Sequence, residues 1–170
     1  MNLKLKKLDQ TKENTFIRDM QYAFQVGAEL EGDHFEEALP EAHVRESLEK
    51  ERSIAYMVMK DDEMVGGVIL DFDSDPSIGY LEFIYVKVGM EGKGLGKEIW
   101  RLIELQHPEI KKWETFTPYS WKRNIHFYIN VCGFQVVEFF NDHHTENDPE
   151  HEGEEYFRFE KYIRSKTTIG

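Results

Sequence analysis

Residues 85–100 read YVKVGMEGKGLGKEIW, a stretch that places three glycines at alternate positions between an apolar run and a helix-like pattern. Glycine has no Cβ, so a glycine-rich turn lets backbone N–H groups approach an anion closely. Residues 95–106 then repeat apolar side chains at helical spacing, and Pro108 marks the end of that pattern. The stretch therefore predicts a strand, a turn able to bind an anionic group, and a helix. A purely structural turn is the alternative, because glycine also ends and bends strands.

Two familiar phosphate-binding motifs do not match this spacing. A Walker A loop requires a glycine five residues before its Gly-Lys pair and a Ser or Thr after the lysine, but Glu91 and Glu98 stand at those positions. The dinucleotide-binding motif requires a third glycine three residues after the second, and Lys97 or Ile99 stands there instead. The sequence therefore argues against a P-loop kinase and against a Rossmann dehydrogenase.

The composition is that of one compact domain. A chain of 170 residues can bury a sizeable core but leaves little room for a second domain, so we expect a single domain over residues 1–164 and a tail over 165–170. No apolar run approaches the ~18 residues of a membrane span, and the N-terminus lacks the apolar segment of a signal peptide. We therefore expect a cytoplasmic protein without a membrane partner. Cys132, the single cysteine, excludes an internal disulfide and a cysteine-built zinc site.

The charge is unevenly distributed along the chain. The formal net charge is −12, which argues against a nucleic-acid partner bound through phosphate neutralisation. Residues 86–123 nevertheless hold eight Lys or Arg and five Glu, a balance of +3, so the rest of the chain carries −15. A local basic segment in an acidic protein favours a small anionic ligand over a long polyanion. Ordinary scatter of surface charge is the alternative.

Hydrophobic periodicity predicts a mixed α/β (α+β) fold, with the order strand, two helices, three antiparallel strands, helix, strand, helix and two strands. Strands are expected at 3–8, 54–60, 64–70, 80–88, 113–117, 134–140 and 155–163. Helices are expected at 13–30, from 40 to about 48, at 95–106, and from 121 to 131, where Gly133 can form a left-handed cap. Together these elements predict a mixed sheet of about seven strands flanked by about four helices.

Two motifs in register resemble those of the acetyl-CoA-dependent N-acetyltransferase (GNAT) superfamily. The first is Val86 at a strand end, followed by Glu91 and the run GKGLG that opens a helix. The second lies in RNIHFYINVCGF (123–134) and comprises Asn124, Phe127-Tyr128 and Gly133-Phe134. The resemblance covers nearly the whole chain. It implies a GNAT-like sheet and acetyl-CoA as co-substrate, with no metal.

This sequence departs from the family pattern at two positions. Glu91 stands where the family usually has Arg or Gln, and Val88 stands where Pro is frequent. We expect Glu91 to contribute its backbone N–H and to turn its carboxylate to solvent. Lys93 and Lys97 would then offset its charge. Binding of the cofactor should survive, although more weakly.

The resemblance also implies a role for individual residues. The residues that it implies for cofactor binding are Tyr85, Val86, Val88, Glu91, Gly92, Lys93, Gly94, Leu95, Gly96, Lys97, Asn124 and Phe127. Backbone N–H groups at 85–88 would bind pantetheine and polarise the thioester oxygen, while Asn124 would hydrogen-bond the pantetheine arm. Tyr128 would protonate the leaving sulfur. Glu82, four residues before Val86 and on the same strand face by alternation, is the candidate base, and His126 is a weaker one. Cys132 is expected in the core.

The acceptor is expected to be a small-molecule or peptidyl amine, and a cationic one is favoured. In the family, the amine enters between the first two helices and the loop joining the last two strands. Residues 29–46 carry seven carboxylates against one arginine, and residues 141–155 carry seven against no Lys or Arg. Such a negative entrance would steer cations, although both segments could simply be solvated. His143, His144 and His151 in the second segment lack the spacing of a helical metal site, so a solvated loop is expected.

The sequence thus favours an acyl-CoA-dependent N-acyltransferase, most simply an acetyltransferase, that acts by direct attack in a ternary complex. The alternative is a non-catalytic acyl-CoA-binding module on the same fold, which Glu91 makes more credible. The retained Tyr128 favours the enzyme. A monomer and a homodimer are both compatible with the sequence.

Overall fold

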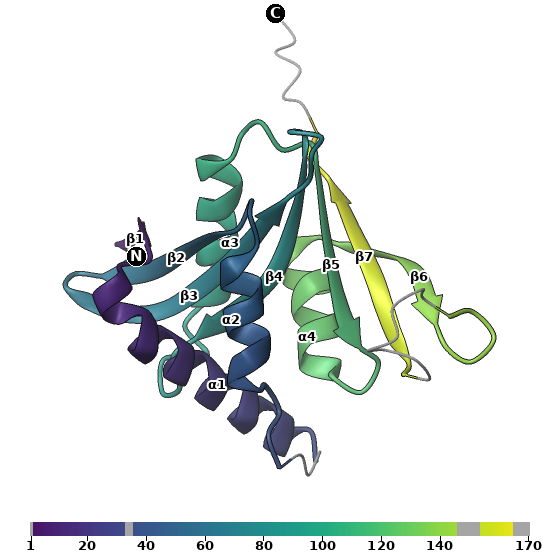
Figure 1. Cartoon of the computed structure of the whole chain (residues 1–170), viewed down its shortest axis with the longest axis horizontal. Coiled ribbons are helices and arrows are strands. Elements are labelled where there is room, and N and C mark those ends of the chain that lie inside the picture. Colours follow the sequence, from purple (N-terminus) through teal and green to yellow (C-terminus); the bar gives the residue numbers. More distant parts are fainter. Residues whose placement is uncertain (1, 33–35, 146–153, 165–170) are drawn as a thin grey trace, which may run out of the picture.

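The computed structural model describes residues 2–32, 36–145 and 154–164, and in this part of the chain one seven-stranded sheet has helices on both faces (Figure 1). The strand order is β1-β2-β3-β4-β5-β7-β6. The strands span Leu3–Lys7 (β1), Ile54–Lys60 (β2), Glu63–Phe72 (β3), Ile78–Val86 (β4), Lys112–Pro118 (β5), Gln135–Phe140 (β6) and Tyr156–Tyr162 (β7). The α-helices span Glu13–Leu30 (α1), Glu41–Glu49 (α2), Leu95–Gln106 (α3) and Lys122–His126 (α4). The predicted fold class and element order are confirmed.

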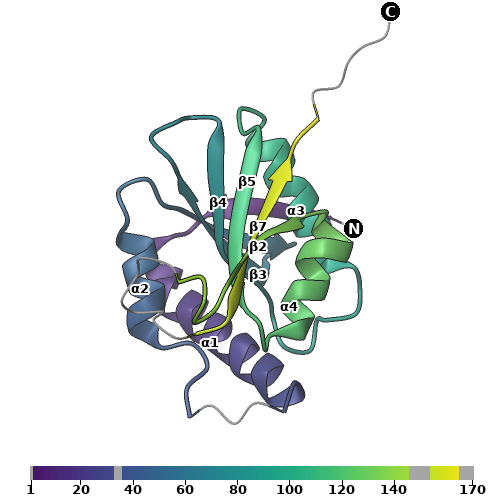
Figure 2. The ribbon, with the colours of Figure 1, turned by 90° about the vertical axis from the view of Figure 1, so that its right-hand side faces the viewer.

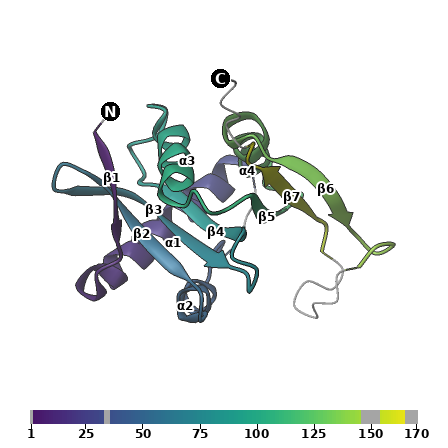
Figure 3. The same cartoon turned by 90° about the horizontal axis from the view of Figure 1, so that it is seen from above.

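Two hydrophobic clusters lie on opposite faces of the sheet, and Figure 3 shows α3 and α4 on one side and α1 and α2 on the other. The cluster beneath α3 and α4 includes Trp113 and Ile99, both fully buried. The cluster beneath α1 and α2 includes Phe16, Met20 and Val44, which are also fully buried. Each such side chain contributes about 1.5–3 kcal/mol by leaving water. Burial on both faces therefore fixes the sheet between its two helical layers.

The sheet divides where β4 meets β5. These two strands run parallel, joined through α3, and their pairing registers only Ile78–Tyr80 against Lys112–Glu114. Next to these pairs, one further contact joins the two strands: the Thr115 hydroxyl donates a hydrogen bond to the Leu81 carbonyl at 2.9 Å. Beyond that point the two strands diverge, as Figure 1 shows. The carboxyl-terminal half of β4 therefore has an edge that β5 does not cover.

Strand β4 also contains a β-bulge. Ile69 of β3 pairs with Phe83 and the next residue, Leu70, pairs with Leu81, so Glu82 is the extra residue. A bulge interrupts the alternation of side chains between the two faces. Leu81, Ile84 and Val86 accordingly contact the cluster beneath α3 and α4 although their spacing is not strictly even. The prediction that Glu82 shares a face with Val86 by alternation is therefore wrong.

The helix predicted from Trp121 to Val131 forms in two pieces. The five-residue α4 is followed by a π-helical turn over Phe127–Cys132, which ends at Gly133 with a φ of 87°. A π turn accommodates one more residue than the corresponding α turn and rotates the side chains that follow it. The left-handed glycine cap is as predicted. Smaller differences are a short 3₁₀ turn at Gln10–Lys12 and the end of β4 at Val86 rather than Val88.

None of the described helices is both long enough and apolar enough to cross a membrane.

Candidate functional site

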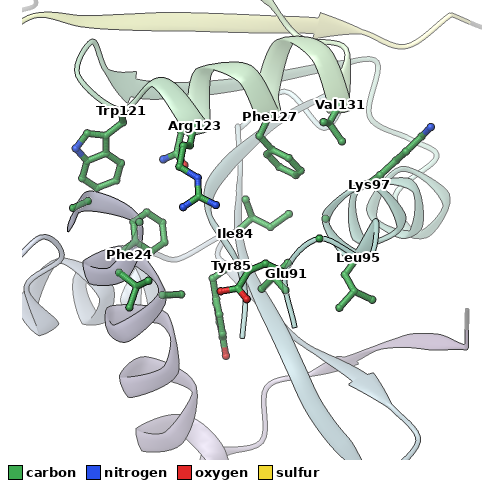
Figure 4. Close-up of a pocket in the computed structure, with 18 of the residues that line it drawn as sticks. Phe24, Ile84, Tyr85, Glu91, Leu95, Lys97, Trp121, Arg123, Phe127 and Val131 are labelled. Atoms are coloured by element: carbon green, nitrogen blue, oxygen red, sulfur yellow. The ribbon is translucent and has the colours of Figure 1, made fainter. Parts of the chain in front are cut away.

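A cavity of about 460 Å³ lies between α1, the carboxyl-terminal end of β4, the glycine-rich loop (residues 89–94) and the α4 segment, by which we mean α4 with its N-cap and the π turn that follows (residues 121–132; Figure 4). In Figure 2 the ribbon of α1 runs below the central strands and the ribbon of α4 lies to their right. All the predicted cofactor-binding residues except Val88 and Lys93 line this cavity. Neither of the predicted catalytic side chains, Tyr128 and Glu82, lines it. The two sequence motifs thus meet in space at one cavity.

The floor of the cavity is the uncovered edge of β4. The Lys87 amide donates to Val65 on β3 at 2.9 Å. Amides alternate between the two sides of an antiparallel strand, so those of Ile84 and Val86 face away from β3, toward the opening beside β5. Both residues line the cavity. The divergence of β4 from β5 therefore turns backbone donors toward any ligand that lies along this strand.

The glycine-rich loop adopts a conformation that favours glycine at several positions. Gly89, Gly92 and Gly94 have φ values of 95°, 79° and 72°, in the left-handed region where a Cβ is strained. Gly94 is the N-cap of α3, and no side chain caps this helix end. The first N–H groups of an α-helix have no partner within the helix. The backbone N–H groups at the start of α3 therefore lie beside the loop that faces the cavity, where they can donate to a ligand.

Gly96, which lines the cavity, also lies where the two sequence motifs pack together. Its φ is not positive, and a Cβ added there would lie 2.7 Å from a ring carbon of Phe127. The glycine therefore lets α3 and the Phe127 ring approach closely. Phe127 lines the cavity beside it. The two motifs pack directly against each other at this point.

Glu91 is exposed, but its side chain is not simply turned away into solvent. Its Oε2 atom accepts a hydrogen bond from the Gly89 amide at 2.7 Å, and the residue lines the cavity (Figure 4). Lys97 lines the cavity as well, whereas the exposed Lys93 does not. Of the two lysines expected to offset Glu91, one therefore faces the same space.

Ten of the twenty lining residues were not predicted, and four of these ten carry aromatic or charged side chains where α1 approaches α4. Phe24 belongs to α1 and Glu31 is the C-cap of that helix, whereas Arg123 belongs to α4 and Trp121 is its N-cap. The Phe24 and Trp121 rings lie 5.5 Å apart, and Glu31 Oε1 accepts the backbone N–H of Arg123 at 2.8 Å. Arg123 stands four residues before Phe127, on the same helical face, so this spacing could have indicated it. Nothing in the sequence showed which face of α1 approaches α4.

Tyr128 lies in the core rather than on the cavity wall. Only 4% of its surface is exposed, and its ring packs edge-on against Phe134 and Phe159. Its hydroxyl hydrogen-bonds with Thr115, the residue that bonds to Leu81 where β4 and β5 begin to diverge. Burial raises the pKa of Tyr128 well above its ordinary value. The hydroxyl is therefore protonated, and it lies at the apex of the opening, the point where β4 and β5 begin to diverge.

Glu82 points toward the other helical layer. Its carboxylate forms an ion pair with Lys50, just beyond the end of α2. Burial disfavours the charge on Lys50, but the hydrogen bond and charge of Glu82 outweigh it and raise the pKa of this lysine. Glu82 thus lies on β4 next to the apex of the opening, held by a partner that the sequence did not predict.

The other candidates from the sequence are Cys132, His126 and the histidines of the segment 141–155. Cys132 is buried, as predicted, and burial raises the pKa of its thiol to about 12. His144 contacts Glu138 at 2.7 Å, and His151 lies outside the described residues. His126 contacts Asn130 on the exposed side of its turn, and it does not line the cavity. Within the described residues, no three His, Cys, Asp or Glu side chains are grouped to hold a metal ion.

The sequence model of the Acetyltransferase (GNAT) family matches residues 19–134. This range contains α1 from Asp19 onward, β4, the glycine-rich loop and the α4 segment, and so all the residues that line the cavity. The chain belongs to the GNAT acetyltransferase family. The predicted resemblance is confirmed.

This GNAT protein is also similar to other known proteins. It is 34% identical to the uncharacterized protein YrkN of Bacillus subtilis (strain 168) over 163 residues, which covers 89% of this chain and 88% of YrkN. Among solved structures, it is similar to PaiA N-acetyltransferase from Thermoplasma acidophilum in complex with coenzyme A, with a TM-score of 0.71, 19% identity, and coverage of 96% and 100% of the two chains. It is also similar to spermidine N-acetyltransferase from Vibrio cholerae, with a TM-score of 0.65, 15% identity, and coverage of 94% and 95%. These two likenesses support the fold.

Proposed function

We propose that this GNAT protein transfers an acetyl group from acetyl-CoA to a primary amine by direct attack in a ternary complex. The observation that carries the proposal is the single cavity joining the glycine-rich loop to the uncovered backbone donors of β4. The loop is suited to the diphosphate, and β4 is suited to the extended pantetheine arm. The amides of Ile84 and Val86 would also stabilise charge that develops on the thioester oxygen. Asn124, on the opposite wall, is a side-chain partner for the pantetheine amides.

The reaction forms a C–N bond and breaks the C–S bond of the thioester, so one proton must leave the amine and one must reach the sulfur. Tyr128 is the proposed acid, because its protonated hydroxyl stands at the apex of the opening. Its raised pKa makes it a weaker acid than an exposed tyrosine. Glu82 is the proposed base, acting directly or through water. It would have to exchange its contact with Lys50 for one with the amine.

A cationic acceptor fits the distribution of charge near the α1 end of the cavity. Glu31 lines the cavity, and Glu36, Glu37 and Glu41 follow it in the described chain. The other acidic segment, 141–155, lies partly outside the described residues. Negative groups around an entrance raise the local concentration of cations. The similar enzyme from Vibrio cholerae is, by its name, a spermidine acetyltransferase, so polyamines are sensible first acceptors to test. We further propose that the protein works in the cytoplasm.

A non-catalytic acyl-CoA-binding module remains the second candidate, and the burial of Tyr128 away from the cavity wall favours it. One experiment separates the two. Purified protein is mixed with acetyl-CoA and a panel of polyamines, amino acids and peptides, and free thiol is followed with a disulfide reagent. Calorimetry with coenzyme A is run in parallel. Amine-dependent thiol release supports the enzyme, binding without release supports the module, and the absence of binding refutes both.

A further inference from the structure

The charged side chains that line the cavity are two acids and two bases. Glu31 and Glu91 are the acids, and Lys97 and Arg123 are the bases. Their formal charges cancel. If either base were lost, the lining would carry a net negative charge toward a cofactor that is itself anionic. The balance therefore depends on each base: Lys97 lies in the first turn of α3, beside the glycine-rich loop, and Arg123 lies on α4.

Glu91 is the unfavourable member of this set. Its carboxylate hydrogen-bonds the Gly89 amide at 2.7 Å, so it remains beside the loop rather than extending away from it. This hydrogen bond also uses the N–H group of Gly89, which belongs to the loop that the proposed function assigns to binding phosphate. A carboxylate in this position repels a diphosphate and competes with it for backbone N–H groups.

Arg123 faces this space from the opposite wall. Its backbone is held by Glu31 across the gap between α1 and α4, which fixes the root of the side chain. Figure 4 shows its guanidinium projecting from the α4 segment into the cavity, on the side where Glu91 lies. Within the described part of the chain, neither Arg123 nor Glu91 has an ion-pair partner within 4.0 Å. The positive charge of Arg123 is thus directed into the cavity and is not used by another described side chain.

We propose that Arg123 supplies, from α4, a positive charge that offsets the carboxylate of Glu91 in the glycine-rich loop, and that it thereby determines affinity for the phosphate-bearing part of the cofactor. This inference rests on the proposed function, since it takes acyl-CoA to be the ligand of the cavity. Guanidinium groups suit this task because they remain charged and donate several hydrogen bonds to phosphate oxygens. The role of Arg123 is electrostatic, so it is measured in binding as well as in turnover.

The test is a double-mutant cycle read by calorimetry with coenzyme A. Arg123→Gln should weaken binding by about tenfold or more, as expected for loss of a charge-assisted contact. Glu91→Gln should strengthen binding several-fold, because it removes repulsion and keeps a similar shape. The double variant should return to within about threefold of the wild type, since the two changes oppose each other. Pantetheine, which has no phosphate, should bind Arg123→Gln and wild type about equally.

Lys122→Gln is the matched control, because it removes the same charge from the adjacent residue. Lys122 does not line the cavity, and its Nζ lies 3.4 Å from the centre of the Tyr119 ring. The inference is overturned if Lys122→Gln weakens binding as much as Arg123→Gln, if pantetheine loses as much affinity as coenzyme A, or if the double variant stays as weak as Arg123→Gln. Thermal unfolding of each variant confirms that it is folded, and Arg123→Lys should retain most of the affinity. A wild-type protein that binds no coenzyme A refutes the proposed function itself, whereas normal binding by Arg123→Gln refutes this inference alone.

Discussion

The contact between Gly96 and Phe127 gives the sharpest prediction about the cavity. A Cβ at position 96 would lie 2.7 Å from one ring carbon and 3.2 Å from another, whereas ordinary contacts begin at 3.4 Å. Gly96→Ala must therefore move the ring, or α3, by about 0.7 Å or more, and the ring borders the cavity. Overpacking of this kind costs about 1–3 kcal/mol. In a chain of this size, each kcal/mol lowers Tm by about 2–4 °C.

The assay combines thermal unfolding with calorimetry using coenzyme A. We expect Gly96→Ala to lower Tm and to weaken binding by about tenfold, and Gly96→Val to do more of both. The control is the pair Gly96→Ala/Phe127→Ala, in which the clashing ring is absent. This double variant should be more stable than the sum of the two single effects allows. If Gly96→Ala unfolds and binds like the wild type, or if the two effects simply add, the contact is not what the glycine provides.

The remaining predictions concern the proposed chemistry. Tyr128→Phe should lower kcat by about 10²–10⁴-fold while leaving coenzyme A affinity nearly unchanged; equal kcat values would make Tyr128 a packing residue. Glu82→Gln should lower kcat in the same way, and it should also lower Tm because Lys50 loses its partner. Since Glu82 raises the pKa of Lys50, that stabilisation is fully present below the ordinary lysine pKa of about 10.4 and is lost as pH rises through the folded-state value. The Tm difference should thus hold from pH 7 to 9 and narrow at higher pH, and a difference that grows with pH contradicts the assignment. For a polyamine acceptor, raising ionic strength to about physiological, where screening acts over ~8 Å, should increase KM; a KM indifferent to salt would remove the negative entrance from the proposal.

The sequence was informative where function depends on local chain geometry. The glycines at 89–96 predict a turn and a helix start because positive φ values are tied to residue type, and the order of strands follows from periodicity. The sequence was uninformative where one extra residue shifts the pairing of a strand or widens a turn of a helix. A single extra residue at Glu82 redirects the side chains of β4, and the π turn at 127–132 alters the faces of the predicted helix. Neither irregularity has a composition that distinguishes it from a regular strand or helix.

The sequence also did not show which residues from distant parts of the chain meet at the cavity. Arg123 and Trp121 precede the recognised motif by only a few positions, and Phe24 and Glu31 belong to a helix whose amphipathic pattern shows only that one face is buried. That α1 reaches the start of α4 is set by the packing of the whole sheet, as the bond from Arg123 to Glu31 shows. A single sequence carries no direct signal for such a pairing.

The short pairing of β4 with β5 has a consequence for how the molecule opens. In the described part of the chain, strands β1–β4 and strands β5–β7 are connected by three residue pairs, by the bond from the Thr115 hydroxyl, and by a bond from the Lys112 amide to Ser77, which directly precedes β4. Strands within each group are paired over five to seven positions. Native proteins open in cooperative units whose boundaries follow their weakest connections, so the two groups should exchange amide hydrogens as separate units. A ligand that spans both walls would hold the two units together, and its removal would release the β5–β7 unit first.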